Sequence, residues 1–325
     1  MPAAALLAVR VSPADAGRRV TVRHRYEGST LTDVVGRLLS WVDGVLTVER
    51  RDGSRVEVPA ADVVAAKVIA PEVSAEDLQR VAERGWVPWE TATLGDWELR
   101  AAGGITGRAN SVRVAGSPGT ALDEALAHVR AWYEHRGLPP LLQMPVPSGY
   151  DDALEARGWA VARRTVLRTG AVADLLRDAR EVDGVVLLRL DVPTPEFLAL
   201  VEPGLDPAGV LRILTAPTHV VHVEVRDRAT GALLGTGRGS VTSAPSGRWL
   251  GVTSIATAPQ ARRRGVAVAV MGELGRWAQS LGADRVLLQM LATNEAAGRL
   301  YDGLGVVPHH RYEYRSPVHG SVSPS

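Results

Sequence analysis

The chain has no cysteine among its 325 residues, which excludes disulfides, thiolate nucleophiles and cysteine-ligated metals. Lysine is almost absent as well: Lys67 is the single one, and arginine carries the remaining positive charge. The bias toward arginine, alanine, valine and glycine is typical of a GC-rich genome and indicates no particular activity. The composition therefore excludes several mechanisms and selects none.

A long apolar run and an excess of one charge are also missing. No stretch approaches the ~18 apolar residues of a membrane span, and residues 1–17 lack the basic start of a signal peptide. Lys+Arg 37 against Asp+Glu 36 gives a net charge of +1, which argues against binding to nucleic acid or an anionic membrane. We therefore expect a cytoplasmic protein that binds neither.

The first zone, residues 1–70, alternates β-branched and charged residues around turns such as Asp43-Gly44. Asp-Gly between alternating apolar residues is a strong hairpin signal. The expected strands cover residues 18–27, 32–39, 45–52, 54–59 and 63–70. Short strands of this kind bury their faces only by curling together, so we predict a small all-β, SH3-like barrel.

Two further zones alternate strands and helices. In residues 71–170 the pattern predicts helices at 74–84, 120–136 and 150–157, with strands at 97–102, 110–115, 141–144 and 161–168. After a linker near 170–184, residues 186–317 follow a similar order, with strands at 185–190, 219–226, 233–243, 249–256, 285–290 and 311–315 and helices at 266–281 and 295–304. Residues 318–325 are expected to form a disordered tail.

The second and third zones contain an internal repeat. Residues 126–168 and 271–315 share a helix with a tryptophan, a glycine after the helix, the strand Leu-Leu-Gln-Met, a short helix and a second glycine. The copies differ before the long helix, where the second has PQARRRGVA (259–267) and the first has VAGSPGTA (114–121). We therefore expect the two copies to share a fold and to differ in what they bind.

The segment PQARRRGVA has the features of an anion site. The first N–H groups of a helix have no intrahelical partner, and the helix dipole adds partial positive charge there. A pyrophosphate binds well at such a place. Gly265 lets the backbone turn toward the phosphates, Ala267 adds no bulk, and the arginines suit bidentate phosphate contacts.

The order of motifs in residues 186–317 resembles the GNAT superfamily of acetyl-CoA-dependent N-acetyltransferases. A strand ending in IATAP is followed by R-x-x-G-x-A at a helix start and then by N-x-x-A-x-x-L-Y-x-x-L-G from Asn294 to Gly305. Residues 71–170 are similar to a degenerate GNAT-like half. The whole chain resembles an actinobacterial subfamily, which implies an α/β (α+β) GNAT fold in tandem halves, preceded by the SH3-like barrel.

The resemblance implies roles for particular residues. Main-chain groups of Ile255, Ala256 and Thr257 would pair with the pantetheine amides of acetyl-CoA as a ligand added to a strand edge. Tyr301 would protonate the departing thiolate as general acid, and it lies two helical turns after Asn294. The expected cofactor-binding set is Ile255, Ala256, Thr257, Arg262, Arg263, Arg264, Gly265, Val266, Ala267, Val268 and Asn294.

A general base is missing from this motif. GNAT enzymes often place an acid on the strand before the phosphate loop, but residues 249–258 contain none. Glu224 on the preceding strand is one candidate, and water relays, an already deprotonated amine or residues of the first copy are others. The loop at 104–112 is a candidate wall of the acceptor groove. The histidines show no metal-site spacing, so no metal is expected.

These features predict an N-acetyltransferase that transfers acetyl directly from acetyl-CoA to an acceptor amine in a ternary complex. A second possibility is a tandem enzyme similar to mycothiol synthase. A third, suggested by the missing base, is an acetyl-CoA sensor or adaptor whose catalysis has decayed. The acceptor amine, the role of the barrel and the oligomeric state are not predicted.

Overall fold

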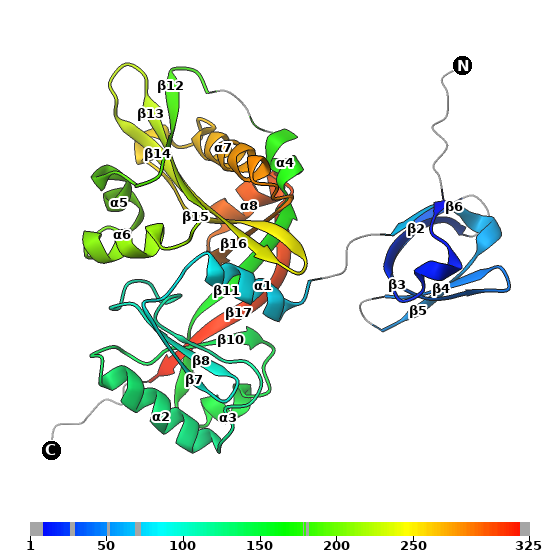
Figure 1. Ribbon diagram of the computed structural model, residues 1–325, viewed down its shortest axis with the longest axis horizontal. Helices are drawn as coiled ribbons and strands as arrows, with labels where there is room; N and C mark the ends of the chain where they lie inside the picture. The colour runs from blue at the N-terminus through cyan, green and yellow to red at the C-terminus, as the bar shows by residue number, and fades with distance from the viewer. Residues whose placement is uncertain are drawn as a thin grey trace. The chain divides into compact units, whose positions relative to one another are not determined.

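The chain divides into two units, Met1–Val73 and Ser74–Ser325, each with its own β-sheet. The computed structural model describes residues 9–26, 30–50, 53–68, 73–177, 179 and 182–318 (Figure 1). The expected disordered tail lies outside the described residues, apart from Val318.

The first unit is a six-stranded sheet in the order β1-β6-β2-β3-β4-β5. Its elements are β1 (Val9–Arg10), η1 (Pro13–Asp15), β2 (Arg19–Tyr26), β3 (Thr30–Val42), β4 (Val45–Glu49), β5 (Arg55–Pro59), η2 (Ala60–Asp62) and β6 (Val63–Val68). Alternate residues such as Val20 and Val22 are buried in one core with Leu38 and Leu46. The expected small all-β unit is confirmed.

The second unit combines helices with an eleven-stranded sheet. Its first half comprises α1 (Ala75–Arg84), β7 (Glu90–Leu94), β8 (Trp97–Ala101), β9 (Val112–Arg113), α2 (Leu122–Glu134), β10 (Leu142–Val146), α3 (Asp151–Glu155) and β11 (Trp159–Ala171). The rest comprises α4 (Val172–Arg177), β12 (Val185–Leu190), α5 (Pro195–Val201), α6 (Pro207–Thr215), β13 (Val220–Asp227), β14 (Leu233–Ala244), β15 (Gly247–Thr257), η3 (Pro259–Ala261), α7 (Val266–Ser280), β16 (Arg285–Leu291), α8 (Glu295–Gly303) and β17 (Val307–Pro317).

The two halves exchange their last strands. The sheet order is β12-β13-β14-β15-β16-β11-β17-β10-β9-β8-β7, so β11 of the first half pairs with β16 of the second. The strand β17 in turn lies between β11 and β10. Figure 1 shows β11 and β17 running between the part that holds α7 and the part that holds α2. The repeated halves therefore share one continuous sheet.

The strand β14 shows which helices cover which face of this sheet. Gly235, Gly237 and Gly239 face α7, because a Cβ at each would meet Val266, Val270 or Leu274. The intervening Arg238 points to the other face, where its Nε donates to the carbonyl of Leu214, in the last turn of α6, at 2.7 Å. Because the three glycines have no side chain on one face of β14, α7 packs close to the strand. On the other face the Arg238 side chain contacts α6.

Four α-helices and strands of the second unit were not expected from the sequence: β7, α4, α5 and α6. The supposed linker near 170–184 is partly wrong, because residues 172–177 form α4 and bury Val172 and Leu175 against α7. The helices α5 and α6 are short, and each starts with a side-chain N-cap followed by proline. Periodicity over so few residues is too weak to identify a helix.

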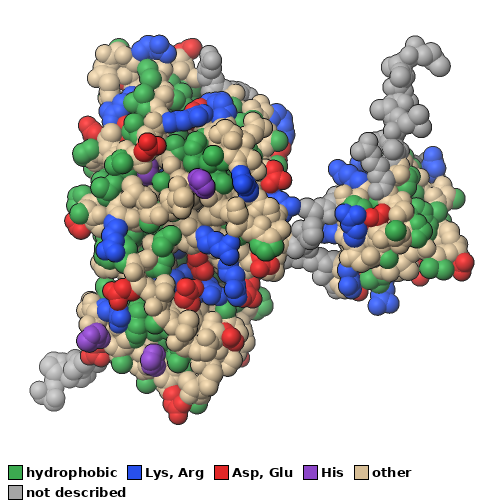
Figure 2. All heavy atoms as spheres, viewed as in Figure 1, with side chains coloured by type: hydrophobic (Ala, Val, Ile, Leu, Met, Phe, Trp, Pro, Cys, Tyr) green, Lys and Arg blue, Asp and Glu red, His purple; other side chains and the backbone are tan. Residues whose placement is uncertain are grey.

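The surface carries both signs of charge. Figure 2 shows Lys and Arg side chains interspersed with Asp and Glu on the face in view, in keeping with the net charge of +1. Among the helices of the described residues, none combines the length and the apolar character that a bilayer crossing needs.

Candidate active site

A groove opens where two parallel strands of the second half separate. β15 and β16 pair only from Trp249↔Arg285 to Val252↔Leu288, although both strands continue further. Beyond that point β15 keeps its partner on the β14 side but is not paired with β16. A cavity of about 490 Å³ lies there, lined by β15, the start of α7, β16 and α8.

The end of β15 contains a bulge that exposes main-chain groups. Ser254 has a left-handed φ of 57°, and the register against β14 shifts at this point. Such a bulge bends the strand and leaves a residue unpaired in the ladder. Ile255 and Thr257 line the groove on the far side of the bulge.

The start of α7 is an open anion site. Gly265 is the N-cap residue, with φ 82° in the left-handed region and no side-chain cap. The backbone N–H groups of residues 263–268 have no main-chain acceptor among the described residues. No acidic residue lies in the first turn of α7, while Arg262 and Arg263 line the groove. Exposed amides, a helix dipole and guanidinium groups together favour a phosphate here.

The helix α8 supplies the opposite wall. Asn294 caps it, accepting from the Ala297 N–H at 3.1 Å, and also lines the groove. Tyr301 lines the groove too, with only 7% of its surface exposed. Burial raises the pKa of Tyr301 to about 12, against an opposing effect of Arg168. The phenol therefore keeps its proton across the physiological pH range.

Most of the predicted site residues come together in this groove. Those that line it are Ile255, Thr257, Arg262, Arg263, Ala267, Asn294 and Tyr301. Ala256, Arg264, Gly265, Val266 and Val268 lie in the same strand end, loop and helix start but are not among the residues that line the groove. The structure does not bring Glu224 there, because it is fully buried on β13 beside Arg226.

A second cavity adjoins the groove. It measures about 430 Å³ and shares Thr253, Ser254, Gln289, Met290 and Leu291 with the first. Its other lining residues are Trp86, Thr106, Gly107, Arg108, Arg163, Thr165, Glu202, Tyr312 and Tyr314. Five segments therefore supply these residues: the loop after α1, the loop before β9, the exchanged strands β11 and β17, and the end of α5.

The loop that enters this cavity is fixed from within by Asn110. Its side-chain oxygen accepts from the N–H groups of Ala102 and Gly104, and its amide nitrogen donates to the carbonyls of Ile105 and Thr106. The amide is buried, so these bonds hold the loop firmly in place. The structure thus places Thr106, Gly107 and Arg108 where the sequence suggested a groove wall.

Two charged groups of the second cavity, Arg163 and Glu202, were not predicted from the sequence, whereas Arg108 belongs to the predicted loop at 104–112. Arg163 stacks over Tyr314 at 4.2 Å, and Arg108 lies over Trp86 at 5.0 Å. Glu202 is half-buried directly after α5, and burial raises its pKa while Arg108 opposes the rise. No local motif marks these residues, because they lie far apart in the sequence.

The corresponding place in the first half is occupied by the chain itself. The Asp96 carboxylate accepts from the Ser117 N–H at 2.9 Å, in the loop that precedes α2. A Cβ on Gly116 would collide with that carboxylate. The first turn of α2 also carries Asp123 and Glu124. The Asp96 carboxylate occupies the position that a phosphate would need, and the negative charges of Asp123 and Glu124 would repel a phosphate there.

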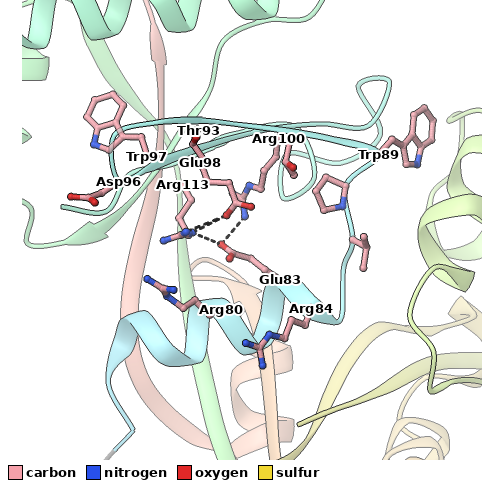
Figure 3. A pocket seen from close by; sticks show the side chains of 13 residues that line it. Arg80, Glu83, Arg84, Trp89, Thr93, Asp96, Trp97, Glu98, Arg100 and Arg113 are labelled. Atoms are coloured by element: carbon pink, nitrogen blue, oxygen red, sulfur yellow. Dashed lines mark hydrogen bonds and ion pairs between the residues drawn. The ribbon is translucent and has the colours of Figure 1, made fainter. Parts of the chain in front are cut away.

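The first half has a cavity of its own, of about 620 Å³, between α1 and the β7–β8 hairpin (Figure 3). Two of its four lining arginines are paired inside the cavity: Arg100 contacts Glu83 at 2.8 Å, and Arg113 contacts both Glu83 and Glu98. Figure 3 shows this network spanning the cavity from α1 to the strands. The two inner arginines, Arg100 and Arg113, thus have carboxylate partners in the protein.

No group of three or more metal-ligating His, Cys, Asp or Glu side chains occurs within the described residues. His309 and His310 contact each other, and His310 lies 3.0 Å from the Gln79 amide. These rings take part in packing of α1 against β17.

The fold, the divided strands and the open helix start define an acetyltransferase of the GNAT class. Residues 75–315 match the family model described as "Probable histone acetyltransferase Rv0428c C-terminal", and residues 14–67 match "Rv0428c N-terminal Sm-like domain". The chain therefore belongs to the Rv0428c acetyltransferase family. The predicted GNAT membership and fold class are confirmed.

Individual relatives agree with this assignment. The "Uncharacterized N-acetyltransferase YobR" of Bacillus subtilis is 26% identical over 248 residues, which are 73% of this chain and 96% of that protein. A GCN5-related N-acetyltransferase from Kribbella flavida has a TM-score of 0.55 at 16% identity, covering 76% of this chain and 95% of its own. A tandem GNAT protein from the clavulanic acid pathway has a TM-score of 0.52 at 16% identity, covering 79% and 90%. The structural matches show the fold alone.

Proposed function

We propose that the protein is an acetyl-CoA-dependent N-acetyltransferase with one acetyl-CoA site, in the groove of the second half. The observation that carries the proposal is the free row of backbone N–H groups at residues 263–268, at one end of a groove that also holds Tyr301. A pyrophosphate fits the helix start, and the pantetheine arm fits along the unpaired edge of β15. The thioester then lies near Tyr301.

The two cavities bind different substrates of the reaction. The groove holds acetyl-CoA, and the adjoining cavity holds the acceptor amine, so both substrates are bound when the acetyl group moves. Tyr301 donates its proton toward the departing sulfur. The water-poor surroundings that raise the pKa of Tyr301 also make the departing thiolate beside it more basic. A more basic thiolate favours proton transfer from Tyr301 to the sulfur.

In this proposal the first half does not bind acetyl-CoA. Asp96 and the acids of α2 keep phosphate away from its loop, and the loop before β9 instead forms a wall of the acceptor cavity. An acid, Glu202, lines that cavity, so the missing base on β15 does not by itself favour a non-catalytic sensor.

The proposal is tested by titrating acetyl-CoA into the full chain by calorimetry and mapping amide hydrogen exchange with and without the ligand. We expect binding with one site per chain and slowed exchange at residues 263–268. Absence of binding, or protection confined to residues 114–121 of the first half, would contradict the proposal.

A further inference from the structure

We propose that the acceptor is an amine that also carries an anionic group, a carboxylate or a phosphate. Arg108 and Arg163 bind the anionic group, and Glu202 takes the proton of the ammonium group. This inference rests on the proposed function, because it assigns the substrate class of the cavity that adjoins the acetyl-CoA groove.

The charge balance of the cavity is the first argument. Neither Arg108 nor Arg163 has a carboxylate within 4.0 Å among the residues that the structure describes. Both line the same cavity as the single acid Glu202, which leaves an excess of positive charge. A simple ammonium ion would be repelled by this excess, whereas an amine with an anion of its own would neutralise it.

A third arginine strengthens the positive field. Arg238 is fully buried and lies 5.3 Å from the centre of the Trp86 ring, which lines the cavity. Its Nη1 donates to the Thr253 hydroxyl, and its Nη2 has no partner among the described residues. Burial, together with nearby Arg108, lowers the pKa of Arg238 to about 9. A bound anion would relieve this uncompensated charge.

The buried arginine of the first half, Arg100, is different, because side chains of the protein itself pair with it. Arg100 is as buried as Arg238, but it contacts Glu83 at 2.8 Å and donates to Gln143 and Ser111. A buried arginine is normally paired in this way. Arg238 is buried without a described carboxylate partner, and Arg108 and Arg163 nearby also have none, which points to an anionic ligand as the partner.

The aromatic side chains hold the guanidinium groups by their faces. Arg163 stacks on Tyr314 and Arg108 on Trp86. Stacking uses the planar face of the guanidinium and leaves its N–H edge free for a bidentate contact. A carboxylate or a phosphate matches that edge.

Glu202 has the position and the environment of a general base. It is half-buried, it lines the cavity, and burial raises its pKa. The charged and titratable side chains facing it from the other lining elements are Arg108, Arg163, Tyr312 and Tyr314. Burial raises the pKa of Tyr312 well above its ordinary value, so the phenol does not compete for the proton near neutral pH. Glu202 is therefore the group that can accept it.

The proton balance of the transfer follows. The ammonium group gives one proton to Glu202, and the free amine attacks the thioester carbon. The new C–N bond forms, the C–S bond breaks, and the sulfur takes the proton of Tyr301. The second proton of the amine nitrogen restores the Tyr301 phenol, and Glu202 releases its proton to water.

Matched amines test the substrate class. We would titrate phenylalanine against phenylalaninamide, and phosphoethanolamine against ethanolamine, into the full chain saturated with CoA, and measure acetylation of the same compounds with acetyl-CoA. The anionic member of at least one pair should bind about tenfold tighter than its neutral partner, as expected for a charge-assisted hydrogen bond. The pair with the larger preference distinguishes a carboxylate from a phosphate.

Variants separate this inference from the proposed function. R108A and R163A should each remove about tenfold of the preference while leaving acetyl-CoA affinity unchanged, and R164A, an exposed neighbour paired with Glu313, should leave both unchanged. Equal binding of both members in each pair, no binding of the anionic members at millimolar concentration, or a preference that survives R108A/R163A would overturn the inference. Loss of acetyl-CoA binding by the native chain would instead overturn the proposed function.

The base is tested by the pH dependence of an accepted amine. Glu202 acts only when deprotonated, so kcat should fall as the pH drops through its pKa, which burial places above that of an exposed glutamate. E202Q should lower kcat by about 100-fold near neutral pH and recover part of it at high pH, where free amine is abundant. Unchanged kcat and pH profile in a folded E202Q would remove Glu202 from the mechanism.

Discussion

The two halves of the acetyltransferase unit share a chain pattern but differ in charge at matching places. The helix α7 begins at an open loop with arginines and no acid, whereas α2 begins at a loop that Asp96 fills and continues with two acids. Four residues before the glycine that follows the short helix, the second half has Tyr301 and the first has Leu154. Under the proposed function, the same fold binds a phosphate and holds an acid catalyst in one half and does neither in the other.

The cavities of the two halves differ in the same sense. In the first half Glu83 joins Arg100 and Arg113 in a closed ionic network. In the acceptor cavity Arg108 and Arg163 face the single acid Glu202 without an ion pair to any described carboxylate. We infer that the paired charges of the first half stabilise the fold, whereas the unpaired arginines of the second cavity bind the proposed acceptor.

The largest expected effect comes from breaking the closed network. Glu83→Ala leaves the buried Arg100 without its carboxylate, and we expect the free energy of unfolding to fall by about 3 kcal/mol. Urea unfolding followed by tryptophan fluorescence measures the change. Glu202→Ala is the control at the end of another helix and should cost below about 0.5 kcal/mol, because no ion pair is lost. Equal losses of unfolding free energy in the two variants would contradict the difference in charge pairing between the two cavities.

A smaller effect is expected from removing the acid catalyst. Tyr301→Phe should lower kcat by about 100-fold and leave the Kd for acetyl-CoA within about twofold, because the ring still fills its place in the core. Tyr150→Phe in the first half, which loses only a hydrogen bond to the Gly116 carbonyl, should leave kcat unchanged. Steady-state kinetics and calorimetry report the two quantities. A normal kcat in Tyr301→Phe would exclude the acid role.

The smallest effect concerns the two helix-start loops directly. Gly265 and Gly119 both have left-handed φ angles, 82° and 75°, with nothing closer than 3.6 Å to an added Cβ. Alanine at either position should cost roughly 1–2 kcal/mol of backbone strain. Only Gly265→Ala should weaken acetyl-CoA binding, by about tenfold, because only that loop contacts phosphate. Equal weakening by Gly119→Ala would mean that the first half binds the cofactor as well.

The residues of the proposed acetyl-CoA groove could be predicted from the sequence because they lie in short continuous segments of the chain. The phosphate loop lies within residues 259–267, and Asn294 and Tyr301 belong to one short helix and its cap. The spacing of residues along one loop or one helix is enough to bring such groups to one face. The assignment of seven predicted residues to the groove lining follows from this.

The residues of the proposed acceptor cavity could not be predicted from the sequence in this way. Its residues Trp86, Arg108, Arg163, Glu202 and Tyr312 come from five segments that only the exchange of β11 and β17 assembles. Glu202 follows α5, a helix of seven residues that the hydrophobic pattern did not reveal. The candidate base Glu224 was chosen from its strand position, and burial beside Arg226 removed it from the site.

The sequence alone determined where a diphosphate can be held, because backbone amides and dipole at a helix start depend only on neighbouring residues. It also determined that the two halves are repeats of one pattern. Only the tertiary structure decided which side chains face the acceptor, because strand pairing between distant segments fixes that arrangement. Only tertiary structure could also show that some arginines are paired and others are not, since an ion pair depends on distance in space.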